Sequence, residues 1–577
     1  MHLQPILSIA AVTSLALAAS AQTTIGTQVH VDAPAATGPC NETTMAASAA
    51  NPLEIVAGWN DYRSNIRCGG GISMDGGKTW SDVVLRPPVP NQASVEGDPM
   101  SCYDDRTGAL WLGAISFAGN GGVYVARKDA GSPTFNPSVM AKASGGADKC
   151  WMAAGPAHNN PNATKVYIAY NEGLLRSSDM GNTWQGPVNL GSLLGPVPRV
   201  GPNGEVYVVT WDVGFSHFLK RSFDGGVTFG PAITVANRLD SWGVDATRVA
   251  GEARVTCING FACDPVNGAL YVVYPDTTNI KPNGSNLDIY FTKSTNQGTT
   301  WSTPTVINLD ASPTPGDQYF PWIECDRNGR LHLTFYDTRT PVQNDSAATA
   351  LITPYYSYSD DGGATWTEAK LMTSPWNSAN DGFGGIFIGD YLGMATGGHL
   401  TTPLYMSTQN GIADTFTHRI QDGPAITYCY GINCPCGNDD PRRGCGNVGS
   451  DSNVATGSEL AVGGTDSLAS DDLTMTLSGI KPGSFALIFT SQTLANVTFG
   501  DGKRCVGGAL KRYAIKAADI NGDVVFGPGE LVGYAASHWG APLAGQDWNY
   551  QGWYRDNPSA CGQNYNVTNA AIVNWKP

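Results

Sequence analysis

The chain has 577 residues, which is more than one ordinary hydrophobic core accommodates, so two or more domains are expected. Its 70 glycines and 36 prolines, with only 14% charged residues, indicate a turn-rich, all-β protein. The formal net charge of -15 repels phosphate backbones and anionic lipid, so no nucleic-acid partner is expected.

Residues 1–21 have the pattern of a signal peptide. An apolar run from Ile6 to Ala19 leads into Ala19-Ser20-Ala21, which has the small-x-small form of a signal-peptidase site. A run of about 14 apolar residues is too short to span a bilayer comfortably, and no later stretch is apolar enough to do so. We therefore expect a secreted or cell-surface protein without a membrane span.

One octapeptide recurs five times, beginning at Ser73, Ser177, Ser222, Ser294 and Ser359. Each copy continues with Asp or Asn, then Gly, Thr and an aromatic residue. Ser and Asp side chains bond the backbone of a tight turn, Gly takes a positive φ, and the aromatic ring is buried between sheets. This Asp box is therefore a β-hairpin staple, and its aspartates are expected to fold the protein rather than to catalyse.

A second repeat precedes the boxes, in which a Gly turn is followed by an alternating apolar strand that ends in an aromatic residue and an acid. It is clearest at 202–212, 264–276 and 326–337. Each unit reads as four strands, which is the pattern of a propeller blade. We predict an all-β fold in which residues 22–425 form a six- or seven-bladed β-propeller. Counting Gly-turn hairpins favours seven, and the alternative is a six-bladed ring completed with the N-terminal strand.

No box occurs from Tyr428 onward. Residues 426–458 are rich in Cys, Gly, Ser and Asn and are expected to form a linker. Residues 459–577 show short strands between Gly-rich turns, which predicts a small β-sandwich. Asp519 to Glu530 mimics a calcium loop, but Val524 stands where that loop needs Gly, so a solvated turn is favoured.

Thirteen cysteines in an exported chain suggest disulfides, with one thiol left over or paired elsewhere. Cys257 and Cys263 are close enough to staple a loop, and a Cys505–Cys561 pair would staple the sandwich. Four cysteines could be read as a zinc cluster, although disulfides are favoured in an exported protein. These four are Cys429, Cys434, Cys436 and Cys445.

The candidate site follows from the alternation of the chain between the two faces of a propeller. If the boxes lie on one face, the starts of the inner strands lie on the other, together with the loops after the second strands. Carboxylates gather there with a few cations and Tyr. The residues singled out are Glu42, Asp98, Asp148, Lys149, Arg199, Glu252, Arg254, Arg339, Asp390 and Tyr391.

This set leaves several interpretations open. Its members could cap turns and pair between blades in a water-lined pore, or the ring of acids could hold a structural calcium ion. No other metal and no organic cofactor is expected. A glycan or polysaccharide is the expected partner, and the protein is expected to be a monomer.

The boxes and hairpins from Asn41 to Phe416 resemble the Asp-box (BNR) superfamily, which includes sialidases, other propeller glycosidases and polysaccharide lyases. The resemblance implies a β-propeller fold and, for a sialidase-like site, a grip on the sugar carboxylate by Arg199, Arg254 and Arg339. Such a grip requires the three arginines to converge on one point. The first inner strand reads Asn41-Glu-Thr-Thr44, where sialidases carry an aromatic-Arg-Ile-Pro motif.

By the same resemblance, Tyr391 activated by Glu252 is the candidate nucleophile and Asp98 the candidate acid. Asp148, Lys149, Asp390 and Glu42 are the further candidates for substrate binding. The functional hypothesis is a secreted carbohydrate-active propeller, a sialidase-like glycoside hydrolase that acts on extracellular glycans. The alternatives are a non-catalytic glycan- or protein-binding propeller and a propeller polysaccharide lyase.

The C-terminal part resembles a module of large secreted proteins from planctomycete-like bacteria. The segments that carry this resemblance are 500–507 and 551–556. It implies a location more than a function. Four nearby aromatic residues are candidates either for stacking on sugar rings or for the sandwich core, namely Trp548, Tyr550, Trp553 and Tyr554.

Overall fold

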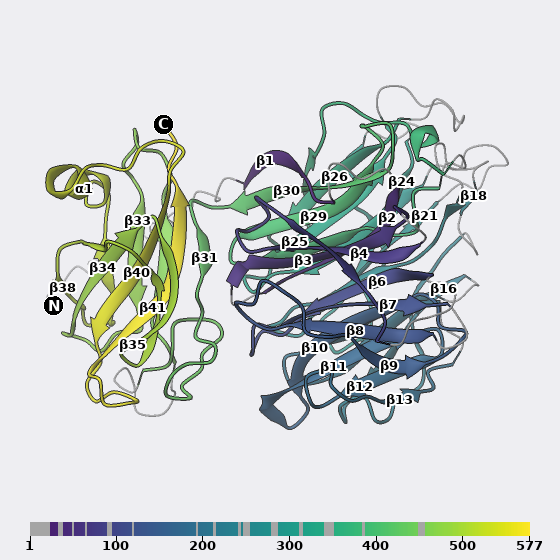
Figure 1. Cartoon of the computed structure of the whole chain (residues 1–577), viewed down its shortest axis with the longest axis horizontal. Coiled ribbons are helices and arrows are strands. Elements are labelled where there is room, and N and C mark those ends of the chain that lie inside the picture. The colour runs from purple at the N-terminus through teal and green to yellow at the C-terminus, as the bar shows by residue number, and fades with distance from the viewer. Residues whose placement is uncertain are drawn as a thin grey trace, which may run out of the picture.

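The computed structural model describes residues 23–32, 38–48, 51–63, 66–88, 95–117, 121–191, 194–211, 215–239, 244–245, 254–277, 287–310, 316–339, 351–383, 387–447 and 456–577. These residues form two bodies, a large ring of β-sheets and a smaller β-module (Figure 1). None of their helices is long and apolar enough to cross a membrane.

Seven four-stranded antiparallel sheets occur among the described residues, and we number them in chain order. Sheet 1 contains β2 (Cys40–Ser48), β3 (Asn51–Asp61), β4 (Arg67–Ser73) and β5 (Ser81–Leu85). Sheet 2 contains β6 (Glu96–Tyr103), β7 (Leu110–Ser116), β8 (Gly122–Lys128) and β9 (Val139–Ala143). Sheet 3 contains β10 (Trp151–Ala157), β11 (Asn160–Tyr170), β12 (Gly173–Ser177) and β13 (Gln185–Val188).

Sheet 4 contains β14 (Leu194–Val200), β15 (Val206–Trp211), β16 (Ser216–Ser222) and β17 (Ile233–Asn237). Sheet 5 contains β20 (Gly260–Cys263), β21 (Leu270–Asp276), β22 (Asp288–Ser294) and β23 (Thr305–Val306). Sheet 6 contains β24 (Gln318–Cys325), β25 (Leu331–Asp337), β26 (Thr353–Ser359) and β27 (Thr367–Lys370). A two-stranded sheet of β18 (Val244–Asp245) and β19 (Arg254–Val255) precedes sheet 5, and the 3-10 helix η1 (Ser378–Asn380) follows sheet 6.

Sheet 7 joins the two ends of the ring. It contains β28 (Gly393–Gly397), β29 (Leu400–Ser407), β30 (Asp414–Asp422) and, as its outermost strand, β1 (Thr23–His30). Strand β1 lies antiparallel beside β30, from Thr23 opposite Asp422 to His30 opposite Phe416 (Figure 1). The ring is thus closed by hydrogen bonds between distant parts of the sequence.

The first strands of the seven sheets surround a common axis. Contacts run from β2 to β6, β10, β14, β20, β24 and β28 in turn, and β28 contacts β2 again. Buried apolar side chains from neighbouring sheets fill the space between them, as in the cluster of Trp111, Val166 and Ile168. The expected β-propeller is confirmed.

The Asp boxes form hydrogen-bonded turns between the third and fourth strands. In the fifth box, the Asp361 carboxylate accepts bonds from the backbone N–H of Ala364 (2.9 Å) and Thr365 (2.9 Å) and from the Thr365 hydroxyl (2.6 Å). Gly363 takes a φ of 86°, which only glycine adopts without strain. Trp366 packs against the buried cluster between sheets 5 and 6. The box therefore staples the turn, as the residue pattern predicts.

The smaller module has its own core around Leu477, Ile488, Tyr550 and Trp575. Its main sheet contains β31 (Ile426–Tyr428), β41 (Tyr565–Asn574), β40 (Asp547–Arg555), β34 (Phe485–Ser491), β37 (Lys511–Arg512) and β38 (Lys516–Ala517). A second sheet contains β32 (Glu459–Gly463), β33 (Thr474–Ser478) and β39 (Val524–Phe526), and β35 (Leu494–Phe499) pairs with β36 (Gly502–Val506). The helix α1 (Val532–His538) follows β39.

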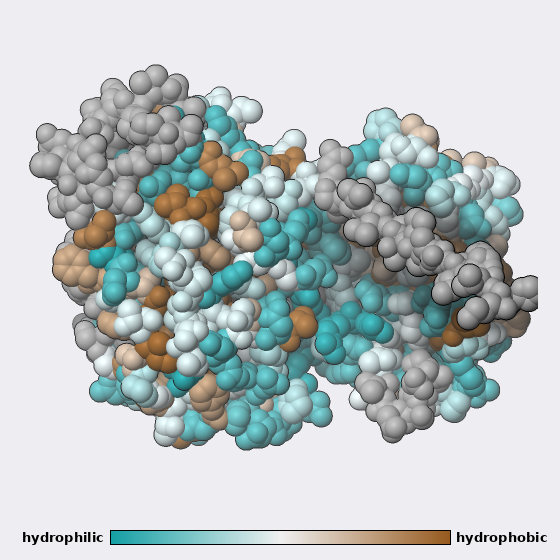
Figure 2. Space-filling view, turned by 180° about the vertical axis from the view of Figure 1, so that it is seen from behind, coloured by the Kyte–Doolittle hydropathy of each residue, from teal (hydrophilic) through white to brown (hydrophobic). Residues whose placement is uncertain are grey.

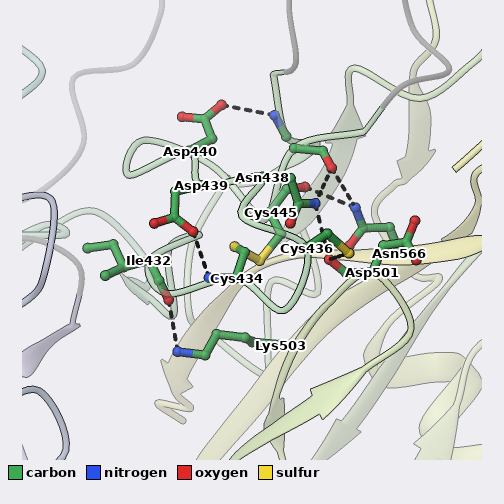
Figure 3. The surroundings of a disulfide bond; sticks show 12 residues. Ile432, Cys434, Cys436, Asn438, Asp439, Asp440, Cys445, Asp501, Lys503 and Asn566 are labelled. Carbon is green, nitrogen blue, oxygen red and sulfur yellow. Dashed lines mark hydrogen bonds between the residues drawn. A yellow bond between two sulfur atoms is a disulfide. The ribbon is translucent and has the colours of Figure 1, made fainter. Parts of the chain in front are cut away.

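Three disulfides hold the start of this module, Cys429–Cys505, Cys434–Cys445 and Cys436–Cys561. Figure 3 shows the surroundings of the Cys434–Cys445 bond. All four cysteines of the suspected zinc cluster are therefore oxidised, and the expected Cys505–Cys561 pair is wrong. The thiol of Cys263 donates to the backbone carbonyl of Asp264 (3.7 Å), so the expected Cys257–Cys263 staple does not form either. Residues 426–428, which we expected in a linker, form the edge strand β31 of the module.

The two bodies meet through a buried apolar cluster, which includes Leu53 and Leu400 of the propeller and Tyr428 of the module, and through polar contacts. Arg327 of the propeller donates to the backbone carbonyl of Pro441, and Lys78 pairs with Asp547. The surface where the two bodies meet is mostly hydrophilic on the face shown in Figure 2. In the module, Tyr550 and Tyr554 are fully buried, so the sandwich core, and not a sugar platform, accounts for these two aromatic residues.

Candidate functional site

The inner strands begin with an unusual backbone at one end of the ring. Glu42, Asp98, Lys149 and Phe320 have φ values of 52°, 50°, 49° and 53°, in the left-handed region that non-glycine residues rarely adopt. The pairing of β2, β6 and β24 shifts register around Glu42, Asp98 and Phe320, which marks β-bulges. Bulges redirect side chains, and strained residues cluster at functional sites. The local backbone therefore turns Glu42, Asp98 and Lys149 away from the regular strand pattern.

Lys149 gathers three carboxylates that come from three other strand starts. Its Nζ lies 2.6 Å from Asp390 Oδ2, 3.4 Å from Glu42 Oε1 and 3.9 Å from Asp98 Oδ1. Because Lys149 precedes sheet 3 and Asp390 precedes sheet 7, this contact spans the ring, and the ammonium group lies close to the axis. The structure thus brings four of the candidate residues, from distant parts of the sequence, to one point.

Burial and charge set the protonation of this cluster. The side chains of Glu42, Asp98 and Asp390 are at most 8% exposed. Burial, reinforced by Asp98 and Asp390 and opposed by Lys149, raises the pKa of Glu42 well above its ordinary value. Burial alone would lower the pKa of Lys149, but the carboxylates outweigh it and raise that pKa. Glu42 is thus the acid of the cluster best suited to keep a proton, while Lys149 stays charged.

Asn60 holds two of the acids and was not among the residues singled out from the sequence. Its side-chain amide donates to Glu42 Oε2 (2.8 Å) and accepts the backbone N–H of Asp98 (2.9 Å). Asn60 is the last residue but one of β3, the second strand of sheet 1, and precedes the acid Asp61. Only its position near the end of a strand could have identified Asn60 as a site residue from the sequence, because an uncharged amide does not stand out by charge. Asp148 lies near Asp98, and burial followed by the Asp98 charge raises the pKa of Asp148.

Tyr391 lies against this cluster. Its ring is 5.6 Å from Lys149 Nζ and makes an edge contact with Trp151, with ring centroids 5.0 Å apart. The hydroxyl is buried, and no hydrogen-bond partner lies within reach among the described residues. Burial and the charges of Glu42 and Asp98 raise the pKa of Tyr391 well above its ordinary value, so the phenol stays protonated. Its suggested activator Glu252 lies outside the described residues.

The candidate arginines do not share this location. Arg199 Nη2 pairs with Glu324 Oε1 (2.7 Å), and its guanidinium lies over the ring of Trp322 (5.6 Å). Arg199 follows Gly195, the residue of β14 with a positive φ of 61°, by four positions. Four strand residues span about 13 Å. Arg199 therefore lies deeper along the channel than the Lys149 cluster.

Arg339 lies in a third environment. It forms ion pairs with Asp337 (2.5 Å) and with Glu368 (2.8 Å), and Glu368 belongs to the outermost strand of sheet 6. Arg199 and Arg339 thus share no partner. For Arg254 the structure describes only the backbone, in β19. In the described part of the chain, Arg199 and Arg339 do not converge on one point, as the carboxylate grip of a sialidase-like site would require.

The two ends of the channel are separated by aromatic rings. Trp151 and Trp322 stack across the ring with centroids 6.4 Å apart, and both are buried. Beyond them, a cavity of about 400 Å³ is lined by residues including Arg199, Glu324 and Arg442. The Lys149 cluster is therefore a separate polar group at the end of the channel opposite to this cavity.

The cluster has the ingredients of general acid and base chemistry on a glycosidic bond. Each carboxylate has an oxygen within 3.9 Å of the same nitrogen, so any two of these oxygens lie within about 8 Å of each other. Four described carboxylates, with Asp148 included, surround one ammonium group, so this site repels an anionic sugar.

No family model matches the chain, and no curated protein matches it. Among solved structures, it is similar to a protein of unknown function from Dyadobacter fermentans DSM 18053 (18% identity, 54% of this chain and 94% of that chain, TM-score 0.34). It is also similar to the Hadza microbial sialidase Hz136 (16%, 66% and 65%, TM-score 0.34). A third is an alpha-L-arabinanase from Penicillium chrysogenum (12%, 70% and 98%, TM-score 0.38). At these values function cannot be transferred, and it has to be argued from the site.

Proposed function

We propose that the chain is a secreted carbohydrate-active propeller that hydrolyses glycosidic bonds in extracellular glycans at the Lys149 cluster. The observation that carries the proposal is the gathering of Glu42, Asp98 and Asp390 around Lys149 by strained strand starts. Glu42 supplies a carboxyl group with a raised pKa, and Asp390, held by its short contact to Lys149, supplies an ionised one. The three disulfides support an extracellular location.

In this proposal Glu42 donates a proton to the leaving oxygen, and Asp390 or Asp98 acts from the other side of the bond as base or nucleophile. The excess of carboxylates over cations, and the separate locations of Arg199 and Arg339, favour an uncharged sugar at the bond that breaks. The sialidase-like version of the hypothesis thus receives less support than a glycosidase for neutral sugars. Tyr391, buried and protonated, forms an aromatic wall of the site.

A lyase mechanism is less well supported. Eliminating across a uronic acid needs a neutral base and a positive environment for the sugar carboxylate. Lys149 is held in its charged form by three acids, and the pKa of Tyr391 is raised, so neither side chain is a good base at neutral pH. The surrounding carboxylates would also repel a uronate.

The second candidate function is a non-catalytic glycan- or protein-binding propeller. It is favoured by one observation, that Lys149 already engages all three carboxylates and so could serve only to hold the ring together. In that case the cluster would stabilise the channel, and a ligand would bind to surrounding residues without turnover.

The experiment is a panel of neutral and sialylated glycans assayed both for sugar release and for binding. We expect release from neutral glycans, reduced at least about a hundredfold in kcat/KM by Glu42→Gln and by Asp390→Asn. Glu205→Gln is the matched control, because Glu205 is also buried but lies at a Gly turn between β14 and β15. Binding without release would favour the second candidate, and release that persists in both site variants would refute the site assignment.

A further inference from the structure

A histidine and two aspartates meet where the two ends of the ring join. His30 ends β1, Asp32 follows it, and Asp414 begins β30, the strand beside which β1 lies (Figure 1). His30 Nε2 lies 3.0 Å from Asp32 Oδ1 and 3.8 Å from Asp414 Oδ2. One ligand atom from each residue lies within 4.8 Å of the other two. This group is separate from the Lys149 cluster and has no part in the proposed reaction.

The spacing of these atoms fits a small divalent transition metal. Zinc binds histidine nitrogen and carboxylate oxygen at about 2.0–2.2 Å, and two ligands on a tetrahedral ion are then about 3.4 Å apart. The distances from His30 Nε2 to Asp32 Oδ1 (3.0 Å) and to Asp414 Oδ2 (3.8 Å) lie on either side of that value. An ion could therefore sit between the three groups with only small side-chain movements.

Charge and burial favour a cation there. Asp32 and Asp414 are buried, with side chains 0% and 6% exposed, and the only cationic group described within 4.0 Å of them is the imidazole of His30. Two buried carboxylates side by side are costly unless they are neutralised. The Nε2 atom of His30 is also buried, and it faces both carboxylates. A histidine nitrogen that faces two carboxylates is a donor set that zinc binds, and binding of the ion would release any proton that the imidazole carries.

Further residues hold the ligands in place. Asp32 Oδ1 accepts bonds from the backbone N–H (2.8 Å) and the hydroxyl (2.9 Å) of Thr415, and Asp414 Oδ2 accepts one from Asn410 (2.9 Å). The ring of His30 stacks on Phe416 with centroids 4.9 Å apart. Such outer contacts orient metal ligands and are typical of built metal sites. The His30 side chain is 21% exposed, which leaves an approach for the ion and for a water ligand.

We propose that His30, Asp32 and Asp414 form a binding site for one divalent transition-metal ion, with zinc as the ion to test, which fastens the N-terminal strand to the last strand of the propeller. The ion binds the folded ring and not the separated strands, so its binding stabilises ring closure. A second group of possible ligands, Cys436, Asp501 and Cys561, offers no thiolate because both cysteines are in a disulfide.

The test uses the whole mature chain, stripped of metal by chelation, with Zn²⁺ alone as the probe. Isothermal titration calorimetry should show one high-affinity ion per chain, and Tm should rise by about 2 °C or more at saturation. His30→Gln and Asp414→Asn should each weaken binding at least about tenfold and abolish the Tm rise. Both replacements are close to isosteric, and circular dichroism of the metal-free variants checks that they fold. Co²⁺ in place of Zn²⁺ should give visible absorption bands that both variants lose.

His538→Gln is the matched control, because His538 is an exposed histidine on α1 of the module, and its binding should equal that of the unaltered chain. The proposal is overturned if Zn²⁺ binds equally to His30→Gln and to the unaltered chain, or if no saturable binding occurs. It is also overturned if added Zn²⁺ changes neither Tm nor the titration heat. His30 would then stabilise the chelated protein only through its own protonation. Loss of sugar release in the Lys149 cluster variants has no bearing on this outcome, so the two proposals fail separately.

Discussion

Lys149→Met is the substitution for which the structure makes the sharpest prediction. It keeps the apolar stem of the side chain but removes the only ammonium group described within 4.0 Å of Glu42, Asp98 and Asp390. Removing one partner from a buried ion pair typically costs about 3–5 kcal/mol, because the other charge is left uncompensated. The Lys149 side chain is only 13% exposed, so screening by water reduces this cost little. We expect a loss of about 3 kcal/mol at pH 8.

The loss should depend on pH in a defined direction. Without Lys149, which opposes the effect of burial, the pKa of Glu42 in the folded chain rises further above its unfolded value, and Asp98 and Asp390 lose the same neighbouring positive charge. The folded variant then binds protons more tightly than the unfolded chain, and its stability falls as pH rises above about 4. At pH 5 protonation of one or two acids relieves the repulsion, and we expect the loss to shrink to about 1 kcal/mol. The destabilisation should therefore grow steadily from pH 5 to pH 8.

The measurement is equilibrium urea unfolding followed by tryptophan fluorescence, with the propeller transition fitted separately from that of the module. Lys220→Met is the control, because Lys220 is a half-buried lysine of β16 with no carboxylate within 4.0 Å in the described part of the chain. Lys149→Met/Asp390→Asn should recover part of the loss at pH 8. A loss below 1 kcal/mol, or the same loss at both pH values, would refute the electrostatic account of the cluster.

Three further results are expected. Asp361→Ala should destabilise the propeller by about 1–2 kcal/mol, since it leaves two backbone N–H groups and the Thr365 hydroxyl without their acceptor. The hydrogen bond from the Thr365 hydroxyl, and then the backbone bonds, lower the pKa of Asp361 to about 2. The stabilisation by Asp361 should therefore vanish as pH falls from about 4 to 2 in acid-unfolding curves. Cys429→Ser, which opens the loop of 76 residues closed with Cys505, should cost the module about 2–5 kcal/mol in urea unfolding, and an unchanged midpoint would contradict this. Sugar release should decline as pH rises through the raised pKa of Glu42, and a rate that instead increased up to pH 9 would exclude Glu42 as the proton donor.

Much of the fold was predictable because it is built from local signals. The Asp boxes, the Gly turns and the alternating strands each involve fewer than about 15 consecutive residues, and each has a direct physical cause in turn chemistry or burial. The disulfides were not predictable, because the partner of Cys429 lies 76 residues away. The strand β31 was missed for a related reason, since it is defined only by pairing with β41 near the C-terminus.

The candidate site was predictable in part, and the errors have one cause. Choosing the residues at the starts of inner strands found Glu42, Asp98, Lys149 and Asp390, because all of them end up at the same face. Arg199 was chosen by the same rule but lies four residues further along its strand than the start of the bulge. Where a strand begins depends on which residue adopts the left-handed backbone, and the sequence marks that only when the residue is glycine.

This left-handed position connects the strain of the backbone to the chemistry of the site. Glycine occupies it in sheet 4, where Gly195 has a φ of 61°, so the bulge itself does not require a side chain. Glu42, Asp98 and Lys149 instead adopt the same backbone at a cost of about 1 kcal/mol or more each. A purely structural axis could be built with glycine and apolar residues, which avoid both this strain and the burial of four ionisable groups. The chain keeps two unfavourable features at one point, and the proton transfer that we propose there would give this strained, buried set of carboxylates a use.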